Sequence, residues 1–193
     1  MSKLYFKTGT MGSGKSLDLI RTVYNYKERG MDITVLKPKV DDRNGTDKCI
    51  IWSRTGASCD ADWINDDTNI LKFVEEQLKS REIKAVVVDE VQFCEEEQIV
   101  QLSDIVTELD IPVITYGLKS NFKGDLFKSI STLFAYADDI QEIRSICWCG
   151  KRANHNARII DGKIVKTGKI VEIGGNEQYI ALCNKHFKKE QLK

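Results

Sequence analysis

The segment GTMGSGKS, residues 9–16, decides the fold predicted for this chain. Gly9 and Gly14 enclose four residues and Lys15-Ser16 follows, which is the spacing of a phosphate-binding loop. The segment lies between LYFKT, a short strand candidate, and LDLIRTVYNYKERG, whose apolar residues recur at helical spacing. Inward-facing backbone N–H groups, the helix N-terminus and Lys15 would favour phosphate oxygens, and Ser16 would bind Mg²⁺. An ordinary glycine-rich turn with a surface lysine is the alternative, which the flanking strand and helix disfavour.

Strand candidates and helical patterns alternate through the first 140 residues. Such alternation is typical of an α/β fold, a parallel sheet with helices on both faces. Residues 38–67 are rich in Asp, Asn, Ser and Gly, and we expect them to form a long excursion from the sheet. The predicted strands cover residues 4–8, 33–36, 85–88 and 113–116, and the predicted helices cover residues 17–30, 69–80 and 95–109.

Composition narrows the class of protein. The chain has 193 residues, 41% of them hydrophobic, which is enough for one α/β domain and a small annex. Lysine plus arginine and aspartate plus glutamate number 29 each, and this balance disfavours a globally basic nucleic-acid binder. No apolar stretch approaches the roughly 20 residues of a membrane span, and no signal peptide is apparent. We therefore expect a cytoplasmic protein with thiols or metal-ligating cysteines rather than disulfides.

The pattern changes near residue 140. Short strand candidates replace long helices, with turn signals at Asp161-Gly162 and Gly174-Gly175. We predict an α/β nucleotide-binding domain over residues 1–143 and a small β subdomain over residues 144–193.

A pair of acids follows the apolar strand at residues 85–88. The carboxyl ends of parallel strands face the ligand crevice, so Asp89 would lie near a metal ion held by the phosphate loop. Glu90 could orient a water molecule, as in an ATPase, or accept the proton of a substrate hydroxyl, as in a kinase. The residue type does not separate these roles, and two acids that merely end a strand in solvent are a third explanation.

The C-terminal part contains a candidate zinc site. Cys147 and Cys149 form one pair and Cys183 and His186 another, and thiolate plus imidazole ligands suit tetrahedral zinc. With all four positions taken by protein, the zinc would be structural. One residue between the first two cysteines is tighter than the usual spacing, and buried thiols with a surface histidine are the alternative. The remaining cysteines lack such an arrangement and are predicted core or loop thiols: Cys49, Cys59 and Cys94.

Taken together, the motifs resemble those of the type II thymidine kinases, the cytosolic, zinc-containing thymidine kinase family. The resemblance covers nearly the whole chain. It rests on the order of residues 9–16 with Met11 inside, residues 89–93, residues 116–118 followed by Phe122 and Phe127, the cysteine pairs, and residues 173–175 with Tyr179.

The resemblance implies a RecA-like P-loop domain and a zinc-bound subdomain whose lasso loop closes over the nucleoside. It implies transfer of the γ-phosphate of ATP, with Mg²⁺, to the 5′-hydroxyl of thymidine, with deoxyuridine as an alternative acceptor. A homotetramer is also implied, and neither nucleic acid nor a membrane is an expected partner.

The resemblance also assigns residues. Glu90 matches the catalytic carboxylate that accepts the 5′-hydroxyl proton, and Asp89 matches the acid associated with Mg²⁺. The nucleotide-binding set is Gly9, Thr10, Met11, Gly12, Ser13, Gly14, Lys15, Ser16, Asp89 and Gln92. The nucleoside-binding set is Met11, Phe93, Leu118, Phe122, Phe127, Ile170, Ile173, Gly174 and Tyr179. Phe122 and Phe127 lie in a polar stretch without clean periodicity, which favours a binding loop over core.

Two other classes of protein share some of these features. A P-loop ATPase would use Glu90 to orient water and would hydrolyse nucleotide without any nucleoside. A zinc-ribbon nucleic-acid binder would need a concentrated basic face, for which the region offers little beyond Lys185, Lys188 and Lys189. The aromatic residues favour the nucleoside kinase.

Overall fold

The larger part of the protein is a three-layer α/β unit. The computed structural model describes residues 1–39, 48–168, 170 and 179–193. In chain order the unit consists of β1 (Leu4–Thr8), α1 (Lys15–Lys27), β2 (Ile33–Pro38), β3 (Ile50–Trp52), β4 (Ser58–Asp60), β5 (Asp62–Ile64), α2 (Ile70–Leu78), β6 (Ala85–Val88), the 3₁₀ helix η1 (Val91–Phe93), α3 (Glu96–Leu109), β7 (Val113–Gly117), α4 (Lys128–Tyr136) and β8 (Asp139–Glu142).

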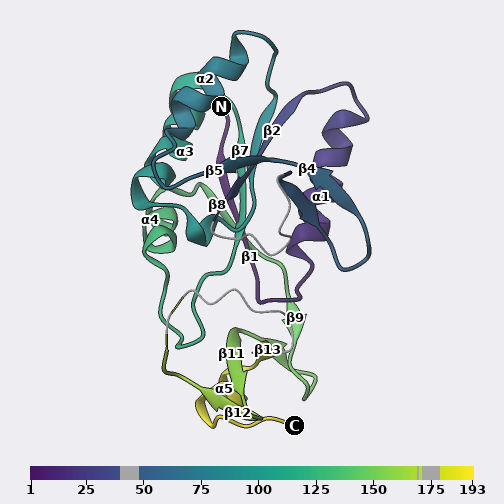
Figure 1. The fold of residues 1–193 in the computed structure, drawn as a ribbon, viewed down its shortest axis with the longest axis vertical. Coiled ribbons are helices and arrows are strands. Elements are labelled where there is room, and N and C mark those ends of the chain that lie inside the picture. The colour runs from purple at the N-terminus through teal and green to yellow at the C-terminus, as the bar shows by residue number, and fades with distance from the viewer. Residues whose placement is uncertain (40–47, 169, 171–178) are drawn as a thin grey trace.

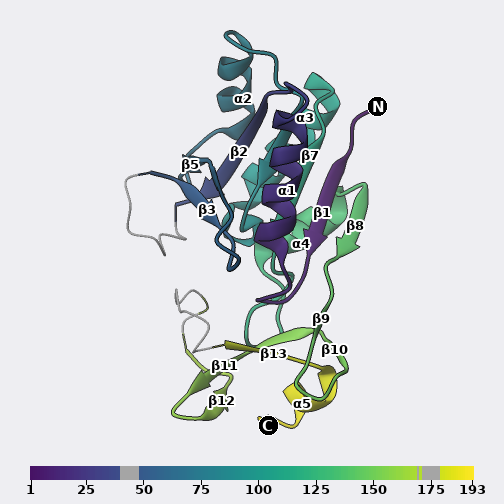
Figure 2. The same ribbon diagram turned by 90° about the vertical axis from the view of Figure 1, so that its right-hand side faces the viewer.

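Six of these strands form one sheet in the order β5-β2-β6-β7-β1-β8, and every neighbouring pair is parallel. Helix α1 covers one face, and α2, α3 and α4 cover the other (Figures 1 and 2). The parallel α/β architecture is therefore confirmed.

The central strands are apolar on both faces because both faces are covered. In β6, Val86 and Val88 pack in the cluster beneath α2, α3 and α4, whereas Ala85 and Val87 pack in the cluster beneath α1. All four side chains are fully buried. Such an unbroken apolar run identifies a central strand.

Local signals mark the ends of several helices. The side chain of Asn69 accepts a hydrogen bond from the backbone N–H of Lys72 and thereby caps α2. A capping box between Glu95 and Gln98 begins α3. Helix α1 ends at Lys27, three residues before Gly30. The predicted helix boundaries lie within three residues of the observed ones.

The predicted excursion at residues 38–67 contains more structure than expected. β3 and β4 form an antiparallel hairpin, and β5 joins the edge of the main sheet beside β2. The other edge strand, β8, has the sequence DIQE and carries no apolar signal. Neither edge of the sheet was predicted.

The smaller part is a β unit below the carboxyl edge of the sheet (Figure 2). Its elements are β9 (Ser145–Ile146), β10 (Arg152–Ala153), β11 (His155–Ile160), β12 (Lys163–Val165), β13 (Tyr179–Leu182) and α5 (Asn184–Lys188).

A two-residue turn joins β11 to β12. Asp161 and Gly162 both have positive φ, 49° and 74°, as a type I′ hairpin requires. The predicted turn at these residues is confirmed, and β13 pairs antiparallel with the other side of β11. The second predicted turn, Gly174-Gly175, lies outside the described residues.

None of the helices in the described ranges combines the length and apolarity that crossing a membrane requires.

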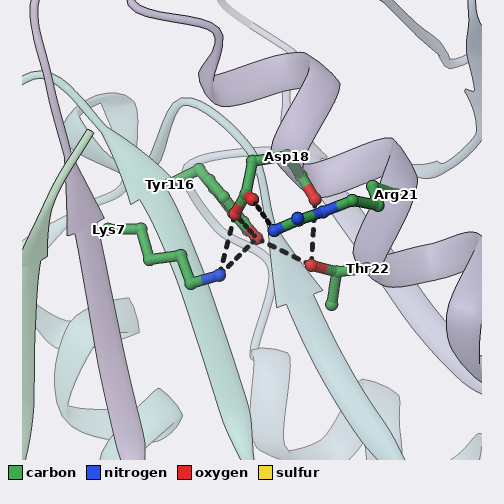
Figure 3. A network of polar contacts seen from close by, with 5 residues as sticks. All are labelled: Lys7, Asp18, Arg21, Thr22 and Tyr116. Atoms are coloured by element: carbon green, nitrogen blue, oxygen red, sulfur yellow. Dashed lines mark hydrogen bonds and ion pairs between the residues drawn. The ribbon is translucent and has the colours of Figure 1, made fainter. Parts of the chain in front are cut away.

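A polar network fixes α1 on the sheet (Figure 3). Asp18 of α1 accepts hydrogen bonds from Lys7 Nζ of β1 at 2.8 Å and from the Tyr116 hydroxyl of β7 at 2.9 Å. The Thr22 hydroxyl lies 3.1 Å from the Tyr116 hydroxyl, and Arg21 pairs with Asp18 on the exposed side. The network joins two sheet strands to the helix that follows the phosphate loop.

The network sets the ionisation of Asp18. Burial opposes the charged carboxylate, but the hydrogen bonds from Lys7 and Tyr116 and the charges of Lys7 and Arg21 outweigh it. The pKa of Asp18 is therefore lowered. Burial raises the pKa of Tyr116, which keeps its hydroxyl protonated and able to donate.

We predict that Asp18→Asn lowers the free energy of unfolding by about 1–3 kcal/mol at pH 7, because Lys7 and Tyr116 lose a charged partner. Urea unfolding measures this. Because the folded-state pKa is depressed, the stabilisation is present above the unfolded pKa of about 3.9 and is lost as the pH falls through the folded pKa. The difference from wild type should therefore shrink below about pH 4. The exposed Asp67 provides the control: Asp67→Asn should stay within about 0.5 kcal/mol of wild type.

Candidate active site

The loop at residues 9–16 has the conformation of a preformed anion cradle. Gly12 and Gly14 adopt positive φ, 75° and 92°, and Gly14 is the N-cap of α1. The Lys15 side chain is buried and its Nζ donates to the carbonyl oxygens of Gly9 and Thr10, at 3.3 and 3.0 Å. The ammonium group is thereby held at the rim of the loop, where phosphate charge would be neutralised.

A segment from the far end of the chain supports the outer side of this loop. The N–H of Met11 donates to Asn156 Oδ1 at 2.8 Å, and the Thr10 hydroxyl contacts that of Ser145. A Cβ atom at Gly9 would lie 2.5 Å from the carbonyl oxygen of Ile143, so only glycine allows this approach. The loop is therefore pinned from the side of the smaller unit.

The acid pair lies at the same edge of the sheet as the loop. β7 separates β6 from β1, and the register aligns Val88 with Thr115 and Thr115 with Phe6. β1 and β7 end opposite each other, at Thr8 and Gly117, whereas β6 ends two residues earlier, at Val88 opposite Thr115. The backbones after β6 and β1 are therefore about 10 Å apart across the sheet and offset by about 7 Å along it. Side chains from Asp89 and the loop can approach one triphosphate from the two sides.

The two acids differ in environment. Asp89 is buried, 3% exposed, and its N–H donates to the Leu36 carbonyl of β2 at 2.9 Å. Glu90 is half-buried and adopts a left-handed conformation, φ 49° and ψ 42°, which a non-glycine residue takes up at a cost of about 1 kcal/mol or more. Its Oε2 accepts a hydrogen bond from Gln92 Nε2 at 2.7 Å. The chain turns sharply here, so the two carboxylates belong to different surroundings. Two acids that merely end a strand in solvent are not what the structure shows.

The predicted nucleoside residues lie on the loops at this edge and on the smaller unit. The rings of Phe93 and Phe127 meet edge to face with centroids 6.1 Å apart, and Phe127 also packs against the main core. Phe127 therefore has a contact with the core as well, and its role in a binding loop stays a prediction.

Phe122 lies against the smaller unit. Its ring is 2% exposed, and the Arg158 guanidinium of β11 lies 5.5 Å from the ring centroid. Tyr179 of β13 stands opposite Arg158 in the strand register, so these residues link the loop after β7 to the smaller unit.

The other predicted nucleoside residues are placed as follows. Leu118 follows β7 and is half-buried, whereas Ile170 is exposed. Ile173 and Gly174 lie outside the described residues.

The predicted zinc ligands converge. The ligand atoms of Cys147, Cys149, Cys183 and His186 all lie within 4.8 Å of one another. Cys147 Sγ lies 3.3 Å from His186 Nδ1, and the Cys149 and Cys183 sulfurs lie 3.9 Å apart. Tetrahedral zinc with Zn–S bonds of about 2.3 Å places ligand atoms about 3.5–3.8 Å apart, so the cluster fits the metal.

A tight turn brings together Cys147 and Cys149, which only one residue separates. Gly150 has φ 82°, its N–H donates to the Cys147 carbonyl, and the Cys147 N–H donates to the Lys151 carbonyl. The Trp148 ring stacks on the His186 ring at 4.2 Å. His186 is buried, so the alternative of a surface histidine is wrong.

Sequence comparison adds the family. A family model described as thymidine kinase matches residues 2–187. The chain belongs to the thymidine kinase family.

Individual members of the thymidine kinase family are similar along their whole length. The thymidine kinase of Haemophilus influenzae is 42% identical over 191 residues, which cover 98% of each chain. That of Shewanella oneidensis is 41% identical over 97% of each chain. That of Rhodopirellula baltica is 41% identical over 97% of this chain and 89% of its own.

Three residues that lie against the loop at residues 9–16 were missed from sequence. Asn156 and Ser145 both support the phosphate loop, yet they lie 145 and 135 residues from their partners and belong to no motif. Arg54, in the turn between β3 and β4, also lies at the loop: a Cβ atom at Gly12 would be 3.2 Å from its Nη1. Arg54 belongs to no sequence motif and lies in a stretch without clear periodicity, so the sequence did not indicate its place beside the loop.

The remaining thiols, at Cys49, Cys59 and Cys94, are buried or half-buried. Burial raises the pKa of Cys49 and Cys94 to about 12 and that of Cys59 to about 11. The prediction of core or loop thiols is confirmed, because Cys94 packs in the main core, Cys59 packs against the cluster beneath α1 and Cys49 is buried.

We predict that Cys183→Ala or His186→Ala reduces bound zinc from about one ion per chain to a small fraction, because three ligands bind zinc far more weakly than four. Metal analysis of purified protein measures this. Cys59→Ala, which removes a thiol outside the cluster, should keep its zinc. Full zinc occupancy in both cluster variants would contradict the assignment.

Proposed function

We propose that this member of the thymidine kinase family transfers the γ-phosphate of ATP to the 5′-hydroxyl of thymidine and yields the monophosphate. Family membership and the name shared by its relatives support the activity. The observation that carries the proposal is that the loop at residues 9–16 and the pair Asp89-Glu90 open on one edge of one parallel sheet.

The nucleotide would bind through the loop backbone. The N–H groups of residues 12–16 and the N-terminus of α1 would bind the phosphate oxygens, and Lys15 would neutralise their charge. A hydroxyl and a carboxylate, from Ser16 and Asp89, are hard oxygen ligands that suit Mg²⁺. When bound, Mg²⁺ supplies further positive charge at the transferring phosphate.

Glu90 would act on the acceptor. A sugar hydroxyl has a very high pKa and is not deprotonated in advance, so a carboxylate mainly orients the hydroxyl and accepts its proton late. The hydrogen bond from Gln92 holds the Glu90 carboxylate in one orientation. This role needs positioning rather than a covalent intermediate, as is usual for phosphoryl transfer.

We propose a division of labour along the chain. Residues 1–143 would bind ATP, and residues 144–193 would bind zinc and supply the lasso loop over the nucleoside. The zinc would be structural, since four protein ligands leave no open position for chemistry. The small cluster around Cys147, Ala157 and Phe187 is a modest core, and a metal is a common supplement to such cores.

The nucleoside would lie among aromatic side chains. Met11, Phe93, Leu118, Phe122 and Tyr179 come from the phosphate loop, η1, the loop after β7 and β13. Flat pyrimidine faces suit aromatic walls. Homotetramer formation stays a prediction from the resemblance, and size-exclusion chromatography with light scattering tests it.

A direct assay tests the function. Purified protein is incubated with ATP, Mg²⁺ and each nucleoside in turn, and the monophosphate is quantified. We expect product with thymidine, and the comparison with deoxyuridine establishes the acceptor range. Hydrolysis of ATP at one rate with or without nucleoside would instead favour the P-loop ATPase. Duplex DNA binding that weakens with salt would favour the nucleic-acid binder.

We predict that Glu90→Gln lowers kcat by roughly 10²-fold or more, because the amide cannot accept the hydroxyl proton. ATP binding, measured by calorimetry with a non-hydrolysable analogue, should change by less than about threefold since the loop is untouched. Lys15→Ala should weaken both binding and turnover.

The control is Glu97→Gln, which neutralises an exposed acid on α3. Its kcat should equal that of wild type. A Glu90→Gln enzyme with unchanged turnover would remove Glu90 from the reaction.

A further inference from the structure

Gln92 makes three hydrogen bonds at the centre of the candidate site. Its side chain is buried, 4% exposed, and its Nε2 donates to Glu90 Oε2 at 2.7 Å. Its Oε1 accepts the backbone N–H of Leu118 at 2.9 Å, and its backbone carbonyl accepts the Ser129 hydroxyl at 2.9 Å. The side chain thus bridges the end of β6 to the loop after β7, and the main chain is tied to α4.

The chemistry of its partners fixes the orientation of this amide. A backbone N–H can only donate, so the atom that faces Leu118 must be the amide oxygen. A carboxylate can only accept, so the atom that faces Glu90 must be the amide nitrogen. Glutamine satisfies both partners at once, whereas a glutamate would satisfy only the Leu118 side.

Gly117 permits the bridge. A Cβ atom at this position would lie 2.6 Å from Gln92 Oε1 and 2.8 Å from Val91 Cγ1, closer than side chains pack. The backbone of β7 and the η1 turn therefore approach each other only because residue 117 lacks a side chain. This close approach is a second, independent sign that the position of Gln92 is built into the fold.

Glu90 depends on such a support. Its backbone is left-handed, a conformation that a residue other than glycine disfavours. A half-buried carboxylate with several rotatable bonds samples fewer positions when hydrogen bonds hold it. The Gln92 amide supplies one such bond from a buried position in which both its oxygen and its nitrogen are engaged.

We propose that Gln92 is a positioning residue of the phosphoryl-transfer site rather than a contact of the nucleotide. It fixes the Glu90 carboxylate relative to the Leu118 backbone. The proton acceptor, Glu90, is thereby held at a defined position relative to Leu118, a predicted contact of the nucleoside. The inference rests on the proposed function, in which Glu90 serves the acceptor hydroxyl and Leu118 contacts the nucleoside.

Two substitutions separate the two ends of the bridge. Gln92→Glu keeps an acceptor for the Leu118 N–H but replaces the donor to Glu90 with a second carboxylate. We expect kcat to fall about 10- to 100-fold while the KM for thymidine changes less than about threefold. Gln92→Leu removes both bonds, so kcat should fall similarly and the KM for thymidine should also rise, by about fivefold or more. The KM for ATP should change less than about threefold in both variants.

Gln101 provides a matched control. It is another buried glutamine whose Oε1 accepts a backbone N–H, that of Ile70, at 2.7 Å, but it lies between α3 and α2. Gln101→Glu and Gln101→Leu should lower thermal stability without altering kcat. Equal losses of kcat in the Gln101 and Gln92 variants would show that instability is the cause and would overturn the proposal, as would a wild-type kcat in Gln92→Glu. If only the KM for ATP rose, Gln92 would be a contact of the nucleotide, and the proposal would be overturned.

A measurement that needs no catalytic activity tests the Gln92 bridge separately from the proposed function. Amide hydrogen exchange at Leu118, followed by NMR in the protein without substrate, should accelerate at least tenfold in Gln92→Leu and stay near wild type in Gln92→Glu. Unchanged exchange in Gln92→Leu would overturn the bridge. A wild-type protein that exchanges as expected but forms no thymidine monophosphate would instead overturn the proposed function.

Discussion

Parallel hydrogen bonding of β6, β7 and β1 is the constraint on which the rest of the structure depends. The register of these strands makes them end within two residues of one another, and the segments that follow them meet at one edge of the sheet. Three unrelated loops therefore become one site: the phosphate loop after β1, the acid pair after β6 and the Gly117-Leu118 segment after β7. The covered faces of the sheet explain why its strands are so apolar, and the polar network at Asp18 fixes the helix that starts at the cradle.

The fold could be predicted from sequence where a segment carries its own signal. The apolar run Val86–Val88 is buried on both faces and so contains no alternation, and Asn69 and Glu95 cap helices through bonds only a few residues long. The edge strand β8 could not be predicted, because DIQE is half-exposed and is held in the sheet by main-chain bonds to β1. The short strands β3–β5 were missed for the same reason: their pairing, not their composition, makes them strands.

The residues of the candidate site also differ in whether a local sequence pattern could reveal them. Lys15 and Asp89 belong to local motifs, and the zinc ligands form two close pairs whose chemistry is distinctive, so spacing and residue type sufficed to place them. Asn156 and Ser145 support the loop through single bonds across more than 130 residues, and an asparagine or serine carries no such signal in sequence. Gln92 was predicted as part of the site, but the two partners that explain its residue type became visible only in three dimensions. Phe127 has a contact with the core that its polar neighbours in the sequence did not indicate.

The bond between Met11 and Asn156 has a consequence for how the molecule can be divided. The loop at residues 9–16 is contacted on its outer side by Asn156 of β11 in the smaller unit, and β8, an edge strand of the sheet, leads directly into that unit. A fragment truncated after β8 would leave the Met11 amide and the Thr10 hydroxyl facing water and would lose the neighbours that shape the glycine turn. The α/β unit therefore takes two contacts of this loop from the smaller unit, and a separated α/β unit would need a substitute for Asn156.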